Sequence, residues 1–360
     1  MLGFFTPWLV YAGITVLHLV LPGRWYQGYV EHEVTGEMLR YRLNGWLVLL
    51  ASVATWAGLG AAGIVPWDWL FLHRWEGLAG AATLGLLFTL ALVLPAPATG
   101  RSVAADLFLG RLVNPQLAGG RIDAKMWLYL IGAVMLELNV LSFTAHHVLT
   151  HDGGTLNPGI LLCAAMLTWF VCDYLTFERV HLYTYDIFAE RVGFKLGWGC
   201  LAFYPYFYAI PLWFTAGLDR PDGLATSPGL LVLYTAVFLL GWSLARGANM
   251  QKFVFKRDPE ALFLGLRPEA LTDGKRRLLV SGFWGVSRHV NYLGEVLMGT
   301  GIALAVGFPA MPWPWLYPLY YVLLLFPRQM DDDARCAAKY GALWDRYQER
   351  VPYRIIPYVW

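Results

Sequence analysis

Charged residues are scarce in this sequence. Only 14% of its 360 residues are Asp, Glu, Lys or Arg, whereas 58% are hydrophobic. Soluble globular chains usually carry about 25% charged residues. The deficit argues against a soluble globular protein and predicts a membrane protein that crosses the bilayer several times. The aromatic share of 16% agrees with this class, because Trp and Tyr concentrate at membrane interfaces.

Cysteine is also scarce, and its spacing argues against two common uses. The four cysteines are Cys163, Cys172, Cys200 and Cys336. None of them belongs to a C-x-x-C pair, so we expect neither a disulfide framework nor a zinc site.

Two further motifs are missing from the sequence. His146, His147 and His151 lie close together but form no H-E-x-x-H pattern, so no metal site is expected. A G-x-G-x-x-G run after a strand is also missing, and a Rossmann domain therefore does not explain any cofactor binding.

Apolar stretches long enough to cross a bilayer recur along the chain. A membrane helix needs about 20 mostly apolar residues. Nine such stretches are expected, at 3–22, 44–66, 76–97, 126–149, 157–176, 196–217, 226–246, 289–309 and 311–327. A tenth could lie in the semi-polar region 176–195. The first stretch lacks a basic region and a cleavage site, so we interpret it as a membrane helix rather than a signal peptide. The fold class expected is an all-α polytopic membrane protein with about ten transmembrane helices.

Three polar segments interrupt this pattern, at 98–125, 246–288 and 328–360. Fifteen of the 27 Lys and Arg residues lie at or beyond Arg246. That bias is typical of a cytoplasmic region that handles anions. Within the last segment, the run Ala334–Tyr347 predicts a helix that ends before the prolines that follow it.

The polar tail places several reactive side chains on one predicted helix face. Asp332, Cys336, Lys339 and Tyr340 follow each other at i, i+4, i+7 and i+8, and Tyr347 continues the face. The alternative is a solvated amphipathic helix that lies on the membrane surface.

Lys252 and Lys256 stand one helical turn apart at the end of an apolar stretch. Two ammonium groups on one face can hold a phosphate, although isolated lysines here would only signal topology. Residues 278–294 add Trp284, Asn291 and Tyr292. Cations, carboxylates, amides and aromatic rings together suit a dinucleotide that carries an extra phosphate. Arg288 and His289, in the same run, receive no assigned role.

Polar residues also lie within or beside the apolar stretches. Glu137 and Asn139 share one stretch, and Tyr204, Tyr206 and Tyr208 surround Pro205 in another. Ionisable groups at membrane depth are costly and indicate a functional cavity. The same reading extends to Glu178 and Asp186, which flank HLYTY, although a water-exposed loop containing Glu178, Asp186 and Glu190 is the alternative.

These segments resemble the sterol reductase family, which includes Δ14-, Δ7- and Δ24(28)-sterol reductases and the membrane domain of the lamin B receptor. The most specific matches are LLVSGFWGVSRHVNYLGE at 278–295 and DDARCAAKYGALWDRYQERVPYRIIPYVW at 332–360. Supporting matches are LRYRLNG at 39–45, GRLVNP at 110–115, FERVHLYTYD at 177–186, GFKLGWGCLAFYPYFYA at 193–209 and NMQK at 249–252. The resemblance covers essentially the whole chain.

The resemblance implies NADPH-dependent reduction of a sterol carbon–carbon double bond, with Δ14 as the first candidate and Δ7 or Δ24(28) as alternatives. It implies one domain over 1–360, in which 1–245 form mainly membrane helices and the sterol side, and 246–360 bind NADPH at the cytoplasmic edge. The sterol would enter from the bilayer. The short loops favour a bacterial inner membrane over the endoplasmic reticulum, and no nucleic acid is expected as a partner.

The family's functional residues correspond to specific positions of this chain. The implied cofactor contacts are Lys252, Lys256, Leu279, Trp284, Asn291, Tyr292, Asp332, Cys336, Ala337, Ala338, Lys339, Tyr340 and Tyr347. On the sterol side we expect Glu178, Asp186, Tyr204 and Tyr208. Tyr347 or Asp332 is expected to deliver the proton, with Tyr208 as a relay or substrate contact.

The chain departs from the family pattern at three places. Asp331 stands where relatives usually have Arg, Ala189–Arg191 where they have H-D-G, and Cys200 where an Asp is common. Two other functions stay open. One is an S-adenosylmethionine-dependent methyltransferase of the related prenylcysteine type, for which Lys252 and Lys256 would be surplus because that ligand has no phosphate. The other is a non-catalytic sterol-binding scaffold, which the nearly complete cofactor signature argues against.

Overall fold

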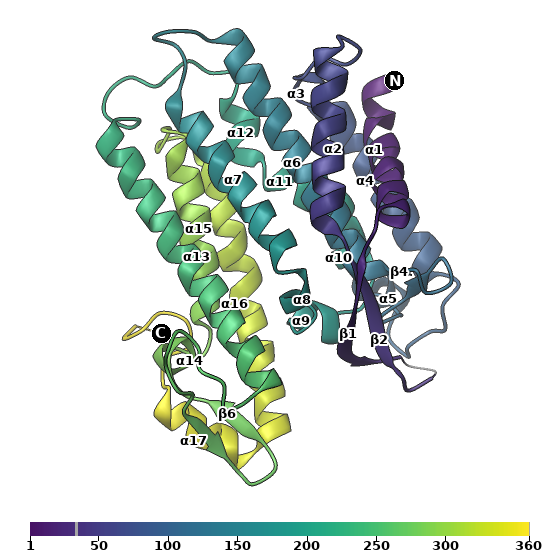
Figure 1. Ribbon diagram of the computed structural model, residues 1–360, viewed down its shortest axis with the longest axis vertical. Coiled ribbons are helices and arrows are strands. Elements are labelled where there is room, and N and C mark those ends of the chain that lie inside the picture. Colours follow the sequence, from purple (N-terminus) through teal and green to yellow (C-terminus); the bar gives the residue numbers. More distant parts are fainter. Residues whose placement is uncertain (33–34, 360) are drawn as a thin grey trace. The chain divides into compact units, whose positions relative to one another are not determined.

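The computed structural model describes residues 1–32 and 35–359, and most of them are helical (Figure 1). The chain divides into two compact units, Met1–Arg220 and Pro221–Trp360. In the described part, five helices are long and apolar enough to cross a membrane: α1 (Leu2–Val20), α4 (Arg74–Val93), α6 (Ala124–Thr150), α7 (Pro158–Thr176) and α13 (Pro228–Arg257). Helices α2 (Gly45–Ala61) and α15 (Val290–Ala305) are apolar but shorter. A polytopic membrane protein is thus supported, whereas ten spans are not confirmed.

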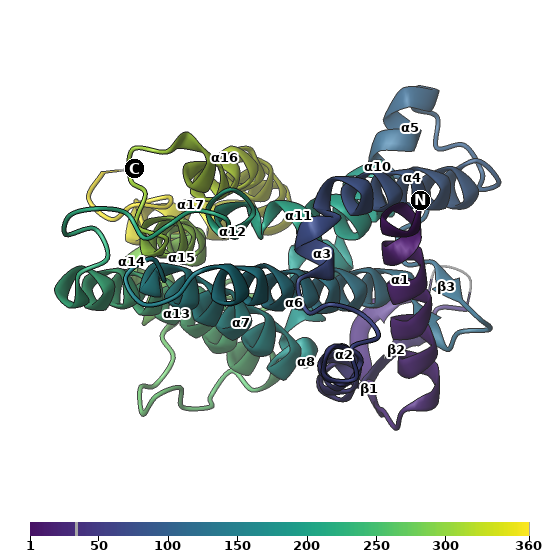
Figure 2. The same ribbon diagram turned by 90° about the horizontal axis from the view of Figure 1, so that it is seen from above.

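Helix α6 forms the centre of the first unit. It packs against α1, α2 and α7, and its most apolar 18-residue window is 78% buried (Figure 2). The sequence fixes where it begins, because the Asp123 carboxylate accepts hydrogen bonds from the Lys125 and Met126 amides. Helix α7 begins in the same way, with Asn157 as its cap and Pro158 in its first turn.

The region after α7 differs from the prediction. No span lies at 176–195, since the described residues there form only two short helices, α8 (Glu178–His181) and α9 (Tyr185–Phe188). The span expected at 196–217 is helical but interrupted. It consists of α10 (Phe194–Trp198), a π-helical turn (Gly199–Phe203), α11 (Tyr204–Phe207) and α12 (Ile210–Thr215). Pro205 and Pro211 lack the amide hydrogen that a continuous helix needs.

The all-α prediction is wrong in one detail, because the structure contains three two-stranded antiparallel hairpins. The largest joins β1 (Arg24–Glu31) to β2 (Met38–Leu43). Its inner face packs Leu39, Tyr41 and Leu43 against Met126, Leu182 and Ile187. A second, short one pairs β3 (Gln116–Leu117) with β4 (Ile122–Asp123). Two short helices, α3 (Trp69–Leu72) and α5 (Val103–Leu109), complete this unit.

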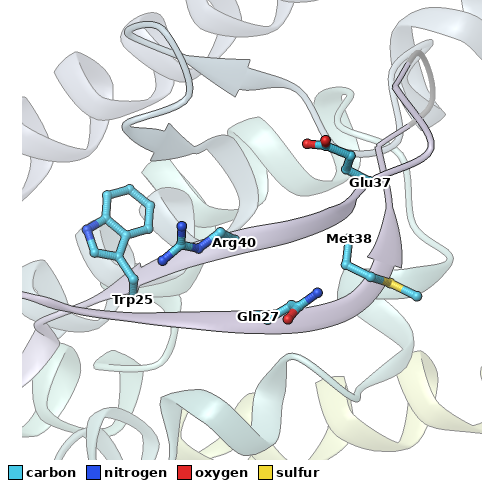
Figure 3. Close-up of a pocket in the computed structure, with 5 residues that line it drawn as sticks. All are labelled: Trp25, Gln27, Glu37, Met38 and Arg40. Atoms are coloured by element: carbon cyan, nitrogen blue, oxygen red, sulfur yellow. The ribbon is translucent and has the colours of Figure 1, made fainter.

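The outer face of the β1–β2 hairpin carries an open pocket of about 590 Å³. Its lining consists of Trp25, Gln27, Glu37, Met38 and Arg40 (Figure 3). None of these residues is among the predicted site residues, and Trp25 and Met38 are themselves exposed. We therefore do not assign the reaction to this pocket.

The second unit is built on three long helices. Helix α15 contacts both α13 and α16 (Pro312–Tyr340), and Figure 1 shows the three side by side. A β-hairpin of β5 (Ala270–Thr272) and β6 (Arg277–Leu279), the short α14 (Phe283–Val286) and α17 (Ala342–Arg350) lie toward one end of these helices. The single helix expected over Ala334–Tyr347 is wrong, because α16 ends at Tyr340 and Gly341 adopts a φ of 54° before α17 begins.

Close contact between α13 and α15 depends on two glycines. A Cβ atom on Gly241 would lie 2.6 Å from the Gly294 carbonyl oxygen, and one on Gly294 would lie 2.5 Å from that of Gly241. Side chains at these positions would force the helices apart, so the sequence permits the short separation only because both residues are glycine.

The Gly241→Ala substitution should destabilise the protein by about 1–3 kcal/mol, because the added methyl group meets backbone atoms that cannot rotate away. The measurement is the midpoint of thermal unfolding in detergent. Gly229→Ala is the matched control, since a Cβ atom there meets nothing within 4 Å on the same helix. Equal midpoints for the two variants would show that this contact is not tight.

Candidate functional site

The predicted cofactor residues of the second unit gather around Trp284 of α14. The indole nitrogen of Trp284 donates to the Ala248 carbonyl at 2.8 Å. Its own carbonyl accepts from the Tyr347 hydroxyl at 3.1 Å. The Lys252 ammonium lies 5.3 Å from the centroid of the Trp284 ring, a cation–π distance. The structure thus joins three predicted residues from α13, α14 and α17.

Tyr347 and Cys336 belong to a common apolar cluster. Val280, Trp344, Tyr347 and Val351 form its buried core, and Cys336 and Tyr340 of α16 pack against it. Burial raises the pKa of the Tyr347 hydroxyl well above its usual value. Burial, and then the charge of Asp332, raises the pKa of the Cys336 thiol to about 11. Both groups are therefore neutral at physiological pH, and Cys336 is not poised as a thiolate nucleophile.

Asn291 and Tyr292 open α15 at the same end of the unit. Tyr292 is buried, and its hydroxyl donates to the Asp332 carboxylate at 3.3 Å. The side-chain oxygen of Asn291 is buried and has no hydrogen-bond partner among the described residues. Leaving a buried acceptor unpaired costs about 1–3 kcal/mol, so this oxygen fits a donor on a bound ligand.

The remaining predicted contacts differ in exposure. Leu279 is buried at the end of β6, whereas Lys256, Ala337, Ala338 and Lys339 are exposed. The exposed ammonium groups of Lys256 and Lys339 can bind phosphates, and the Asn291 oxygen can accept a hydrogen bond. Together with the neighbouring aromatic rings, these groups fit a phosphate-bearing aromatic cofactor.

Arg288 and His289, for which the sequence suggested no role, hold the C-terminal segment. The Arg288 guanidinium donates to the carbonyls of Val351 and Pro352, both at 3.0 Å. The backbone amides of Arg288 and His289 donate to the carbonyls of Tyr353 and Arg354 at 3.0 and 2.7 Å. A strand-like pairing therefore fixes the chain directly after α17.

Asp333 is the acidic partner of this arrangement, and the sequence reasoning missed it. Its carboxylate lies 3.4 Å from both Arg288 and His289, and it accepts from Gln329 at 2.7 Å. Burial raises the pKa of Asp333, but the hydrogen bond from His289 and the charges of Arg288, His289 and Arg354 outweigh it, and the pKa is lowered. The sequence did contain one signal, since Asp333 directly follows the predicted contact Asp332. On a helix the two side chains point about 100° apart, so Asp333 belongs to a neighbouring face with partners of its own.

The predicted sterol contacts all lie in the first unit. Tyr204 is buried and meets Tyr208 edge to face, with ring centroids 4.6 Å apart. Glu178 accepts a hydrogen bond from the Gly45 amide at 3.1 Å. Burial raises the pKa of Glu178 to about 7, and the Gly45 bond only partly opposes this. Glu178 is therefore half-buried and not simply part of a water-exposed loop.

Asp186 and Glu190 have different surroundings. The backbone carbonyl of Asp186 accepts from the buried Lys125 ammonium at 2.9 Å, which anchors α9 to α6. Glu190 pairs with Lys195 at 2.6 Å. The charges of Glu178 and Asp186 both reach Tyr174 of α7, as does Tyr204. Three of the predicted sterol contacts thus lie within electrostatic range of one tyrosine.

The other polar groups of the first unit have local partners. Glu137 accepts from Thr168 at 2.9 Å, and Asn139 donates to the Pro205 carbonyl at 2.8 Å. His146 pairs with Asp68 at 3.0 Å, and His147 bridges the Ala216 carbonyl and the Asn157 amide. Within residues 1–32 and 35–359, no group of three or more His, Cys, Asp or Glu is arranged to hold a metal ion, and all four cysteines are free.

Comparison with known proteins identifies the relatives of this chain. The model of the Ergosterol biosynthesis ERG4/ERG24 family matches residues 3–360. A Delta(14)-sterol reductase from Arabidopsis thaliana is 34% identical over 95% of this chain and 91% of its own length. The Delta(14)-sterol reductase TM7SF2 of Mus musculus is 34% identical over 99% and 86%. A bacterial Delta(14)-sterol reductase, from Methylotuvimicrobium alcaliphilum, is 30% identical over 99% and 83%.

The substitution Asp333→Asn should lower the free energy of unfolding by about 2–4 kcal/mol, because it leaves the buried Arg288 without its counter-charge. Thermal unfolding in detergent measures this. Asp331→Asn is the control: its pair with Arg335 is about half exposed, at 52% on both sides, and should contribute less than about 1 kcal/mol. The wild-type advantage should also shrink as the pH falls through the lowered pKa of Asp333, since protonation removes the charge. Similar losses for both variants would contradict a special role of Asp333.

Proposed function

This chain belongs to the Ergosterol biosynthesis ERG4/ERG24 family, and we propose that it is an NADPH-dependent sterol reductase that saturates a Δ14 double bond. The observation that carries the proposal is the similarity to Delta(14)-sterol reductases over nearly the full length of both chains. The cluster around Trp284 supports it independently, because its donors and rings suit a phosphate-bearing cofactor.

The cofactor part of the proposal rests on the chemistry of the second unit. We assign the phosphates to Lys252, Lys256 and Lys339, and ring contacts to Trp284 and Tyr340. The unpaired oxygen of Asn291 would accept a hydrogen bond from an amide or a ribose hydroxyl. Leu279, Tyr292, Asp332, Cys336, Ala337 and Ala338 would complete the walls. S-adenosylmethionine has no phosphate for these three ammonium groups to bind, which disfavours the methyltransferase alternative.

NADPH supplies a hydride, and the protein must supply a proton to the other carbon of the double bond. Tyr347 fits the role of donor, because burial keeps its hydroxyl protonated at neutral pH. The Asp332 carboxylate accepts a hydrogen bond from Tyr292, so it acts as an acceptor there and not as a proton donor. We therefore assign the role of proton donor to Tyr347. Asp332 orients Tyr292, and Tyr208 remains a candidate sterol contact or relay.

The sterol part of the proposal follows from solubility. A sterol is already dissolved in the bilayer, so it can approach the apolar helices without crossing water. Glu178, Asp186, Tyr204 and Tyr208 would meet its polar end, and Glu178 is half neutral near pH 7 because of its raised pKa. The cofactor would enter from the cytoplasm. The second unit carries most of the Lys and Arg residues of the chain, and such residues usually lie on the cytoplasmic side of a membrane.

The purified protein should convert a Δ14 sterol to its saturated product when NADPH is present. Δ7 and Δ24(28) sterols, offered in parallel, should be reduced at least about tenfold more slowly, which corresponds to about 1.4 kcal/mol in transition-state binding. Products are identified by mass and chromatographic retention. Faster reduction of a Δ7 or Δ24(28) sterol would reassign the substrate, and no reduction of any sterol would contradict the reductase function.

The Tyr347→Phe variant should lose about 100-fold or more of its turnover, because general acid catalysis typically contributes 10²–10⁴-fold. Its protection against thermal unfolding by NADPH should persist, which separates proton delivery from cofactor binding. Tyr353→Phe serves as the control, since it removes a hydroxyl from the neighbouring segment. Full turnover by Tyr347→Phe would remove Tyr347 from the acid role.

A further inference from the structure

Two cations from separate segments of the second unit share the ring of Tyr340. The guanidinium carbon of Arg276, in the turn between β5 and β6, lies 5.9 Å from the ring centroid. The ammonium of Lys339 lies 5.2 Å from the same centroid. Lys339 and Tyr340 are implied cofactor contacts, whereas Arg276 is not among the predicted site residues.

The position of Arg276 is fixed by the hairpin that carries it. Leu271 and Leu278 pack against the cluster formed by Val280, Trp344, Tyr347 and Val351. At the turn, the Asp273 carboxylate accepts hydrogen bonds from the backbone amides of Lys275 and Arg276, at 2.9 and 2.7 Å. The hairpin is thus held against α17, and its turn presents Arg276 to the end of α16.

Positive charge at this point exceeds negative charge. No ion pair involves Arg276 or Lys339 among the described residues. The Asp273 carboxylate lies within electrostatic range of Arg276, but it accepts hydrogen bonds from the turn amides. Lys252 and Lys256 lie within electrostatic range of Lys339, and the Asp332 carboxylate, which acts on Lys252, offsets only part of this positive charge. Cation–π attraction holds two like charges near one ring but does not neutralise them. The arrangement is therefore suited to binding an anion.

A phosphate monoester fits this arrangement better than other anions. It carries about −1.5 to −2 charges at neutral pH and three acceptor oxygens, which match a guanidinium fork and an ammonium. A phosphodiester, the group found in most lipid headgroups, carries only one negative charge. The Tyr340 ring, which both cations approach, also provides an apolar surface for a purine base next to the phosphate.

We propose that Arg276 and Lys339, which both approach the Tyr340 ring, bind the 2′-phosphate of the dinucleotide, and that Arg276 sets the preference for NADPH over NADH. This inference rests on the proposed function, in which NADPH is the cofactor. Arg276 acts on binding and has no part in the proton or hydride step, so its loss should change discrimination between cofactors more than turnover at saturation.

The test measures protection of the full chain against thermal unfolding in lipid-free detergent. The probes are NADPH, NADH, adenosine 2′,5′-bisphosphate and ADP, titrated to obtain apparent dissociation constants. Arg276→Met should lower the preference for NADPH over NADH about tenfold or more, as expected when a charged hydrogen bond is lost. Adenosine 2′,5′-bisphosphate should lose affinity in parallel, whereas NADH and ADP should bind as to the wild type. Arg276→Lys should keep part of the preference.

Arg277→Met is the matched control, because it removes the same charge from the next residue. Arg277 already pairs with Glu260 at 2.7 Å, and both side chains are largely exposed. Its loss should leave the cofactor preference unchanged. An equal loss of cofactor preference in both variants, or equal weakening of NADPH and NADH binding by Arg276→Met, would overturn the inference. The positive charge of the region would then act only by non-specific electrostatic attraction.

The outcomes also separate this inference from the proposed function. If the wild type is protected by neither NADPH nor NADH, the cofactor assignment itself fails. If NADPH protects and Arg276→Met keeps the full preference, only the role of Arg276 is overturned. If Arg276→Met instead loses binding to vesicles that contain anionic phospholipid while its preference persists, the arginine serves lipid headgroups and the 2′-phosphate assignment is wrong.

Discussion

The buried guanidinium of Arg288 holds the C-terminal part of the protein in place. It bonds to two consecutive backbone carbonyls, those of Val351 and Pro352, and faces the Asp333 carboxylate. Burying a charge is costly unless it is paired and hydrogen-bonded. Here the two terminal nitrogens of the guanidinium have partners, whereas Nε has none among the described residues. Because these carbonyls directly follow α17, the bonds hold the segment at the end of α17. They act together with the apolar packing that places Tyr347 near Trp284.

The electrostatic design of this region separates charged from neutral groups. Lys256, Lys339 and Arg276 are exposed, where water and a phosphate can reach them. Cys336 and Tyr347 lie deeper and are kept neutral by burial, which raises the pKa of each. Such a gradient from cationic rim to neutral interior suits a ligand whose phosphates stay hydrated while its reactive ring enters an apolar site.

Much of the helical framework could be predicted from the apolar stretches. Helix α6 was expected at 126–149 and runs over Ala124–Thr150, because length and apolar content alone specify such a helix. The prediction failed where single residues override composition. Pro205 and Pro211 interrupt the next stretch, and Gly341 divides the tail helix.

The break at Gly341 changes how the predicted site is assembled. The sequence argument placed Tyr347 on the same helix face as Cys336 and Tyr340, which requires a continuous helix. In the structure the three residues meet because α17 folds back and packs its apolar side on α16. The grouping of residues was predictable from the pattern, whereas the reason for it was not, since a glycine with positive φ cannot be told from an ordinary helical glycine by spacing.

The partners of Arg288 and His289 were beyond sequence reasoning for another reason. Their main acceptors are backbone carbonyls of residues 351–354, and a carbonyl has no sequence signature. A basic side chain near a predicted phosphate site is easily interpreted as a ligand contact. These two instead bind groups of the protein itself, namely backbone carbonyls and the Asp333 carboxylate. Unlike them, Arg276 and Lys339 form no ion pair in the part of the chain that the structure describes, and that difference separates structural cations from those available to a ligand.

The bond between Tyr347 and Trp284 links the two sides of the proposed reaction centre. Its acceptor is a backbone carbonyl, so it fixes the position of the chain at Trp284 and not merely the indole ring. The indole is fixed in turn by the Ala248 carbonyl of α13. A ligand ring that contacts Trp284 would therefore lie near a Tyr347 oxygen whose position is already fixed. Its one proton is donated to the Trp284 carbonyl, so delivery to a substrate requires a rotation of the hydroxyl but no rearrangement of the chain.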